Sequence, residues 1–289
     1  MTSGGGRDAP PAPAASQGGG RWSDLSRRCA STAVLLGIGT ALALSTGFWL
    51  RAIIAIIVGI TFWELARMTG WRHPEMHGGS LRPQQRARLL GVVAGLTLMA
   101  VMTWFSDLPW LMLLPVLAGL PGTRAGERLT FAGFGVAILL VGDGLVYLRE
   151  SLGLGAVLWV MGVVVISDTL GYFAGRIIGG PKFWPRLSPK KTWSGTVAGW
   201  IGAAVFGLVL ALLARGAPSL IWLSPLIALA GQMGDIAESW LKRRSGVKDS
   251  SSLIPGHGGL MDRFDAVSGA VLAVWAMDSV GVLPISGAA

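Results

Sequence analysis

A dense polar passage, GVKDSSSLIPGHGGLMDRFD at residues 246–265, carries the residue types that handle phosphates and metal ions. The turn PGHGG in its middle cannot be helical, because Pro255 and the three glycines require turns. Glycine backbones let N–H groups point at a phosphate, and a helix that starts after Gly259 presents its N-terminus to the same anion. Asp262 and Asp265 lie three residues apart on one face of that helix. Two carboxylates beside a phosphate-binding turn predict a site for Mg²⁺, which binds one or two carboxylates together with substrate phosphates.

A purely structural role would also explain some residues of this passage. The two aspartates could serve only to cap the positive end of the helix dipole. His257 could be a histidine that forms hydrogen bonds within the turn, without acting as a base. The residue types and their spacing leave these alternatives open.

A second polar cluster, GQMGDIAESWLKRR at 231–244, stands at the end of an apolar segment. Asp235, Ser239 and Lys242 occupy positions i, i+4 and i+7, so they form one stripe along a helix. Glu238 is best explained as a simple i, i+4 ion pair with Lys242. Asp235 lies deeper, beside two glycines, and is therefore the stronger candidate for a functional role.

A third cluster spans residues 167–195, SDTLGYFAGRIIGGPKFWPRLSPKKTWSG. Asp168 lies inside an apolar segment, where an ionised group costs about 2.5–3.5 kcal/mol on insertion scales, and it is therefore a functional candidate. It shares a helix face with Tyr172 and Arg176, and pairing with Arg176 or with a neighbouring helix is the structural alternative. The glycines at 171, 175 and 179 have the GxxxG spacing that is typical of helix packing.

The loop that follows combines cations with hydroxyl groups, which suits a polyphosphate. The residues concerned are Lys182, Arg186, Ser188, Lys190, Lys191 and Thr192. An ordinary basic loop that binds anionic lipid headgroups is the alternative. Carboxylates and cations at one surface suit phosphoryl or nucleotidyl transfer, in which metal ions and basic groups stabilise the negative charge of the transition state.

The composition is that of an integral membrane protein. Of the 289 residues, 52% are hydrophobic and 13% are charged, whereas soluble domains have about 25% charged residues. The 43 glycines allow close packing of helices in lipid. The single cysteine excludes an internal disulfide framework and a zinc site with several cysteines. The net charge of +9 is explained by basic loops on the cytoplasmic side, without a nucleic-acid partner.

We predict an all-α fold, a polytopic transmembrane helical bundle with about nine spans. Residues 1–28 are rich in Gly, Pro, Ala and Ser and are expected to form a disordered cytoplasmic tail. Residues 29–289 are expected to form one transmembrane domain. The predicted spans are 30–48, 49–67, 89–106, 109–121, 130–148, 153–175, 195–214, 218–240 and 264–284, of which the fourth is short.

The distribution of basic residues tests this count. With a cytoplasmic N-terminus and alternating spans, nearly all of the 24 Lys and Arg residues fall on the cytoplasmic side. Only Arg51, Arg149 and Arg215 fall near the other side. This split follows the positive-inside rule. It predicts a cytoplasmic N-terminus, an external C-terminus, and three polar clusters that all face the cytoplasm.

The stretch SWLKRRSGVKDSSSLIPGHGGLMDRFD at 239–265 resembles the signature of the bacterial phosphatidate cytidylyltransferase (CDP-diacylglycerol synthase) family. The pattern is S-x-x-K-R, four residues, K-D, a P-G-H-G-G turn and x-x-D-R-x-D, and every fixed position is present. A second stretch, SPKKTWSG at 188–195, is similar to a family segment in the right order, and the resemblance covers a catalytic region at 162–275. Ser194 stands where the family has glutamate, so any role of that carboxylate does not carry over.

The resemblance implies that CTP and phosphatidic acid form CDP-diacylglycerol and pyrophosphate, with Mg²⁺ required and a second cation left open. The reaction would take place at the cytoplasmic face of the bacterial inner membrane, so the lipid bilayer is a partner as well. A homodimer is compatible with the small-residue helix faces. By resemblance the metal ligands are Asp235 and Asp262, with Asp265 and Asp168 as further candidates.

The resemblance also implies which side chains contact the substrates. Lys242, Arg243, Lys248 and Arg263 are assigned to the phosphates, assisted by Lys190 and Lys191. Asp249 and His257 complete the catalytic set, and His257 would orient a phosphate or Asp262. The residues assigned to substrate binding are Ser188, Thr192, Ser239, Gly256, Gly258 and Gly259, together with the two assisting lysines.

Two other functions stay open. A CTP-dependent kinase acting on a polyprenol or another lipid would transfer the γ-phosphoryl group and release CDP, with Asp235 or His257 as the base for the hydroxyl. A secondary transporter could use Asp143, Asp168, Asp235 and Asp278 as an ion path. The complete signature argues against the kinase, and the concentration of polar residues in the second half of the chain argues against the transporter.

Overall fold

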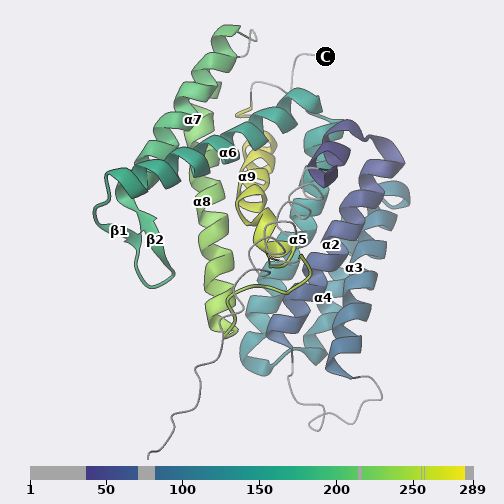
Figure 1. Cartoon of the computed structure of the whole chain (residues 1–289). Helices are drawn as coiled ribbons and strands as arrows, with labels where there is room; N and C mark the ends of the chain where they lie inside the picture. Colours follow the sequence, from purple (N-terminus) through teal and green to yellow (C-terminus); the bar gives the residue numbers. More distant parts are fainter. Residues whose placement is uncertain (1–36, 71–81, 214–216, 255, 257, 284–289) are drawn as a thin grey trace, which may run out of the picture.

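The computed structural model describes residues 37–70, 82–213, 217–254, 256 and 258–283. The tail predicted at 1–28 and His257 lie outside these residues. In the described part, the chain forms a bundle of long helices and one short β-hairpin (Figure 1). The long helices are α2 (Gly47–Thr69), α3 (Pro83–Trp104), α5 (Arg128–Glu150), α6 (Gly153–Ile177), α7 (Trp193–Leu213), α8 (Leu220–Arg244) and α9 (Met261–Ser279). The shorter elements are α4 (Leu114–Gly119), β1 (Lys182–Trp184), β2 (Ser188–Thr192) and 3₁₀ segments at Pro109–Leu113, Leu120–Gly122 and Ala125–Glu127.

In the described part of the chain, six helices are long and apolar enough to cross a membrane, which confirms a helical membrane protein. They are α2, α3, α5 with its preceding turn, α6, α7 and α8. α9 has 19 residues but carries charged side chains at both ends. The fourth predicted span is a broken apolar run at Pro109–Gly122. Each of its three prolines stands at the start of a new short helical segment, because proline fits that position and cannot continue a helix.

The β-hairpin is a difference from the predicted all-α fold. β1 and β2 pair antiparallel, with Lys182 opposite Thr192 and Trp184 opposite Ser188. Gly179 and Gly180 have φ angles of 67° and 104°, which let the chain leave α6 and turn back. The strands are short and polar and follow no alternating apolar pattern, so the sequence indicated only a basic loop.

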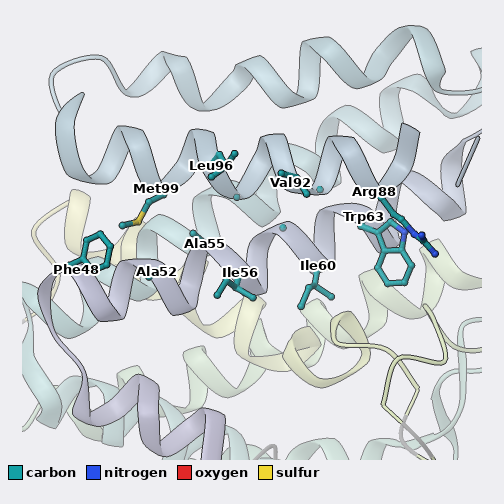
Figure 2. Close-up of a pocket in the computed structure, with 13 residues that line it drawn as sticks. Phe48, Ala52, Ala55, Ile56, Ile60, Trp63, Arg88, Val92, Leu96 and Met99 are labelled. Carbon is teal, nitrogen blue, oxygen red and sulfur yellow. The ribbon is translucent and has the colours of Figure 1, made fainter. Parts of the chain in front are cut away.

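α2 and α3 pack through glycines on both helices. A methyl group at Gly59 would lie 2.9 Å from the Gly91 carbonyl oxygen, so a larger residue there would push the helices apart. Along this pair runs an apolar groove of about 650 Å³, which extends from Phe48 to Trp63 and Arg88 (Figure 2). Arg88 is the charged residue of its lining, at one end, and an otherwise apolar helix surface is what a bilayer interior requires.

α8 and α9 also meet through small residues. A methyl group at Gly234 would overlap the Asp265 carbonyl oxygen, and one at Gly269 would overlap the Ala230 carbonyl oxygen. α8 and α9 therefore run in direct backbone contact, side by side in Figure 1. This contact brings the polar ends of α8 and α9 together.

α6 and α7 pack in the same manner. Gly171 lies against Gly195, and Gly175 lies against Thr192, so the packing role predicted for these two glycines is confirmed. The third glycine of that spacing, Gly179, has a positive φ and belongs to the turn after α6.

The apolar interior has two parts, which meet at α8 and α9. One part gathers around Phe62, Leu98 and Phe131 and draws its residues from α2, α3 and α5. The other gathers residues of α6, α7, α8 and α9 around Val160 and Leu223. The first residue of α9 and the last turns of α8 belong to the first part, whereas the middle of both helices belongs to the second. The polar clusters lie at this junction.

Candidate active site

A group of three carboxylates lies where α8 and α9 touch. Asp235 and Glu238 of α8 and Asp265 of α9 each offer an oxygen, and these oxygens lie within 4.8 Å of one another. Asp235 and Asp265 were predicted as metal ligands, and the structure brings them together. Glu238 was predicted only as an ion-pair partner and is the addition to this group.

Glu238 is the most buried member of the group, with 3% of its surface exposed. Neither of its carboxylate oxygens has a hydrogen-bond partner among the described residues. The predicted i, i+4 pair with Lys242 is present, with the ammonium nitrogen 3.3 Å from Oε1. A buried carboxylate without hydrogen bonds is costly in a protein interior. The position therefore suits a carboxylate whose oxygens are taken up by a bound cation.

Lys242 connects this group to the start of α9. Its Nζ lies 2.6 Å from Asp262 Oδ1 as well as 3.3 Å from Glu238 Oε1, and its side chain is only 14% exposed. The ammonium thus carries positive charge between two buried carboxylates. It was predicted to contact phosphates, and its place beside the carboxylate group is compatible with that role.

Both carboxylate oxygens of Asp262 have partners within the protein. Its Oδ2 accepts hydrogen bonds from the N–H groups of Ser250, at 2.9 Å, and Gly259, at 2.7 Å, and lies 2.9 Å from Ser250 Oγ. Its Oδ1 pairs with Lys242. Asp262 lies in the first turn of α9, which is compatible with the helix-dipole role that the sequence left open. The structure brings Asp262 close to the carboxylate group but not into it.

The N-terminal half of the chain supplies a carboxylate that the sequence analysis missed. Glu64 of α2 is 0% exposed and accepts four hydrogen bonds from the segment 250–261. The signal that could have found it is a single acidic residue inside the apolar stretch ITFWELA, since ionisable groups within such spans are functional candidates.

The β-hairpin approaches the same group from α6 and α7. Lys191 forms an ion pair with Asp235, and Asp168 of α6 interacts electrostatically with both. Asp168 is thus near the site, but it is exposed and lies outside the three-carboxylate group, so its role as a metal ligand stays a prediction. Thr192, predicted to bind substrate, is buried and accepts a hydrogen bond from the Gly195 N–H at the start of α7.

Ser194 occupies the position where the resembled family has glutamate. Its hydroxyl donates to the Gly179 carbonyl oxygen and lies 3.0 Å from Thr192 Oγ1. These contacts tie the two ends of the hairpin segment together. In this chain the position holds the basic hairpin in place and adds no carboxylate to the site.

The remaining predicted residues are mostly exposed or lie in the glycine turn. Arg243, Lys248, Asp249, Arg263 and Lys190 are exposed, and Ser188 is partly buried. Ser239 lies 3.5 Å from Asp235 Oδ1. Gly256 and Gly258 have positive φ angles, as the predicted turn requires. Gly259 packs against Glu64 and gives its N–H to Asp262, so that N–H group is not directed at a ligand.

Asp278, one of the acidic residues proposed as an ion path, lies far along α9 from the three-carboxylate group that contains Asp235. Asp278 hydrogen-bonds to the Tyr147 hydroxyl near the far end of α9. It is thirteen residues from Asp265, about 20 Å along the helix at 1.5 Å per residue. This separation weakens the transporter alternative.

Comparison with known proteins identifies the family. The model of the cytidylyltransferase family matches residues 26–280, most of the chain. The chain belongs to this family. The resemblance noted in the signature at 239–265 is thereby confirmed, and so is the prediction that the chain is a nucleotidyltransferase.

Several similar proteins carry the name phosphatidate cytidylyltransferase. A protein from Brucella abortus biovar 1 is 36% identical over 226 residues, which cover 76% of each chain. One from Pseudomonas aeruginosa is 34% identical over 271 residues, 86% of this chain and 94% of the relative. One from Staphylococcus saprophyticus is 42% identical over 137 residues, 45% of this chain and 52% of the relative. The last match is shorter and has the highest identity of the three.

The donor set of this cytidylyltransferase fits a hard divalent cation. Mg²⁺ takes oxygen ligands and is usually held by a few carboxylates together with substrate phosphates. Asp235, Glu238 and Asp265 supply such oxygens. Glu238 is buried, with Lys242 3.3 Å from Oε1 and no hydrogen-bond partner for Oε2 among the described residues. Lys191 and Lys242 stand beside the group and form ion pairs with Asp235 and Glu238.

Proposed function

We propose that this chain is a phosphatidate cytidylyltransferase, which converts CTP and phosphatidic acid into CDP-diacylglycerol and pyrophosphate. The observation that carries the proposal is the carboxylate group of Asp235, Glu238 and Asp265, with Lys191 and Lys242 beside it. The family match and the names of the relatives support the choice of nucleotide and lipid.

In the proposed reaction, an oxygen of the phosphatidate phosphate attacks the α-phosphorus of CTP. The bond between the α-phosphorus and its bridging oxygen breaks, and pyrophosphate leaves with that electron pair. A phosphomonoester is already an anionic nucleophile near neutral pH, so no side chain has to remove a proton. The chain's contribution is therefore positioning and stabilisation of charge.

We assign Asp235, Glu238 and Asp265 to Mg²⁺, which would neutralise phosphate charge and orient the nucleotide. Lys191 and Lys242 would contact the phosphates, with the exposed cations Arg243, Lys248 and Arg263 around them. Asp262 has a different part in this proposal. It holds the start of α9 and keeps Lys242 directed at the carboxylate group.

We further propose that the site faces the cytoplasm and that the chain crosses the membrane nine times with a cytoplasmic N-terminus, in the bacterial inner membrane. The short run at Pro109–Gly122 supports this count. It starts near the end of α3, and residues 123–124 pair with Gly70 and Thr69 at the end of α2. Such a path returns the chain to the side where α2 ends, so α5 starts on the same side as the site.

Cysteine labelling tests this topology. With Cys29→Ala as background, Ser16→Cys and Ser286→Cys would be probed with an impermeant maleimide on intact spheroplasts. The topology predicts that Ser286→Cys reacts at once and that Ser16→Cys reacts only after permeabilisation. The reverse pattern would overturn the orientation, and equal labelling of both variants would overturn the odd number of spans.

The test of the activity uses CTP labelled at the α or the γ phosphorus. Purified protein in micelles would receive phosphatidic acid, Mg²⁺ and either label. The proposal predicts that the α-label enters the lipid and the γ-label leaves as pyrophosphate. In a parallel assay with a polyprenol in place of phosphatidic acid, entry of the γ-label into the polyprenol with release of CDP would establish the kinase instead. A homodimer stays a prediction, to be checked by light scattering of the protein–detergent complex.

A further inference from the structure

We propose that Glu64 of α2 is a positioning residue of the active site. It holds the segment 250–261 so that α9 presents the Asp265 carboxylate to α8. The inference rests on the proposed function for its kinetic consequences. It rests on hydrogen bonds of the described residues for its geometry. The hydrogen bonds of Glu64 come from Ser250, Ser251, Leu260 and Met261, none of which is assigned to a substrate, and Gly259 packs against it. Glu64 therefore acts through the segment it holds.

All four hydrogen bonds of Glu64 come from this one segment. Oε1 accepts from Ser251 Oγ at 2.5 Å and from the Leu260 N–H at 3.0 Å. Oε2 accepts from Ser250 Oγ at 3.1 Å and from the Met261 N–H at 2.8 Å. Each carboxylate oxygen therefore binds one hydroxyl group and one backbone N–H. The donors lie 186 to 197 residues away in the sequence.

The contacts fix the segment at both of its ends. Leu260 and Met261 stand at the start of α9, where N–H groups have no partner within the helix. Ser250 and Ser251 stand at the beginning of the polar passage, ten residues earlier. The Glu64 carboxylate thus connects Ser250 and Ser251 to the start of α9, and the glycine turn lies between these two points of the chain.

The neighbouring residues extend this connection to the active site. Ser250 Oγ lies 3.1 Å from Glu64 Oε2 and 2.9 Å from Asp262 Oδ2, so its single proton is donated to one of the two carboxylates at a time. Asp262 in turn pairs with Lys242. The chain of contacts runs from Glu64 through Ser250 and Asp262 to the lysine beside Glu238.

Gly259 shows how closely the segment is fitted around Glu64. A methyl group at Gly259 would overlap Ser250 Oγ and Glu64 Oε1. Glycine at this position allows the approach of the segment to the carboxylate. The close approach to Glu64 is thus a structural reason for glycine at position 259.

Stability of α2 alone does not account for Glu64. The residue is 0% exposed and its neighbours on the interior face of α2, such as Phe62 and Leu65, are apolar. A leucine there would pack without the cost of burying a carboxylate. The Glu64 carboxylate instead accepts hydrogen bonds from the polar passage. The preceding residue, Trp63, lines the apolar groove along α2 and α3 (Figure 2).

The test compares Glu64→Gln with Phe131→Leu, a core change in α5 that leaves the segment untouched. Glutamine keeps the shape of the side chain but places an NH₂ group where one carboxylate oxygen accepted a hydrogen bond from a backbone N–H. Two quantities would be measured at a temperature where each variant is fully folded: kcat for CDP-diacylglycerol formation and the dissociation constant of Mn²⁺ by paramagnetic resonance. We expect Glu64→Gln to lower kcat by about 30-fold and weaken Mn²⁺ binding by about 10-fold, because the reacting groups are misplaced.

Phe131→Leu is expected to lower the melting temperature with kcat and the Mn²⁺ constant at wild-type values. If Glu64→Gln behaves in the same way, Glu64 is structural only and the proposal is wrong. If Glu64→Gln does not fold, Ser251→Ala carries the test, because it removes one of the four bonds to Glu64, together with the bond from the Leu253 N–H to Ser251 Oγ, and leaves both backbone contacts of Glu64. We expect about a 5-fold loss of kcat. Wild-type kcat and Mn²⁺ binding in Ser251→Ala would then overturn the proposal.

The two proposals can fail separately. A wild-type protein that forms no CDP-diacylglycerol would overturn the proposed function. The Mn²⁺ constants of wild type and Glu64→Gln would still decide whether Glu64 positions the carboxylate group.

Discussion

The ammonium group of Lys242 lies 2.6 Å from the carboxylate of Asp262, and this contact joins the end of α8 to the start of α9. The same ammonium lies 3.3 Å from Glu238, which belongs to the group of three carboxylates. One lysine therefore links the capping carboxylate of α9 to the candidate metal ligands. Both acidic partners are at most 5% exposed, so solvent does little to screen the pairs.

Lys242→Met is expected to abolish activity and to lower the free energy of unfolding by about 3 kcal/mol, because removal of one partner leaves buried carboxylates without their cation. Melting in detergent and the labelled-CTP assay measure the two effects. Arg244→Met, two residues further along α8, is the matched control. Its pair with Glu127 is 41% exposed on the arginine side, and surface pairs contribute at most about 1 kcal/mol. Similar losses in both variants would contradict the role of Lys242.

Gly234→Ala is expected to disturb the contact of α8 with α9. The added methyl group would overlap the Asp265 carbonyl oxygen, so the helices have to move apart at the position of the carboxylate group. Overpacking of this kind costs about 1–3 kcal/mol, and we expect loss of Mn²⁺ binding in protein that is still folded. Gly133→Ala, at an open position of α5, is the control and should be neutral or slightly stabilising. Intact Mn²⁺ binding in Gly234→Ala would show that the close contact is not required.

Ser194→Ala tests the attachment of the basic hairpin. The change removes the hydrogen bond from Ser194 to the Gly179 carbonyl oxygen. A hydrogen bond contributes about 1 kcal/mol, so we expect the KM for CTP to rise about 5-fold. We expect kcat to stay near the wild-type value, since the carboxylate group is untouched. Ser279→Ala, which loses a hydroxyl bond at the far end of α9, should change neither constant. An unchanged KM in Ser194→Ala would separate the hairpin from nucleotide binding.

The site could be predicted from sequence where its residues lie in one local stretch. The polar stripe of α8 and the first turn of α9 followed from helical spacing and from the signature at 239–265. The apolar spans followed from composition, because a bilayer admits few other patterns. The membrane helices predicted at 49–67 and 130–148 accordingly match α2 and α5 to within two residues at each end, whereas α3 begins six residues before the span predicted at 89–106.

Contacts between distant segments could not be predicted in this way. Glu64 is one acidic residue in an apolar helix, and the sequence around it does not predict a contact with the segment 250–261. Glu238 has the spacing of an ordinary surface ion pair, and its burial arises from the packing of other helices around it, with residues of α2, α5 and α9 lining the same cavity. The β-hairpin depends on two glycines with positive φ and on contacts with α7, and its strands have no pattern of their own.

The most direct test of the account is the transfer of the α-phosphorus of labelled CTP into lipid by Glu238→Gln and by Asp278→Asn. Both changes neutralise a carboxylate in the membrane-embedded part of the molecule, and only Glu238 belongs to the candidate metal group. We predict that folded Glu238→Gln forms CDP-diacylglycerol at about 1% of the wild-type rate or less, because charge stabilisation is the main catalytic contribution. Asp278→Asn should keep about half of the wild-type rate or more, since asparagine can still accept the Tyr147 hydrogen bond. Wild-type transfer by Glu238→Gln would contradict the assignment of the active site to the carboxylates of α8 and α9.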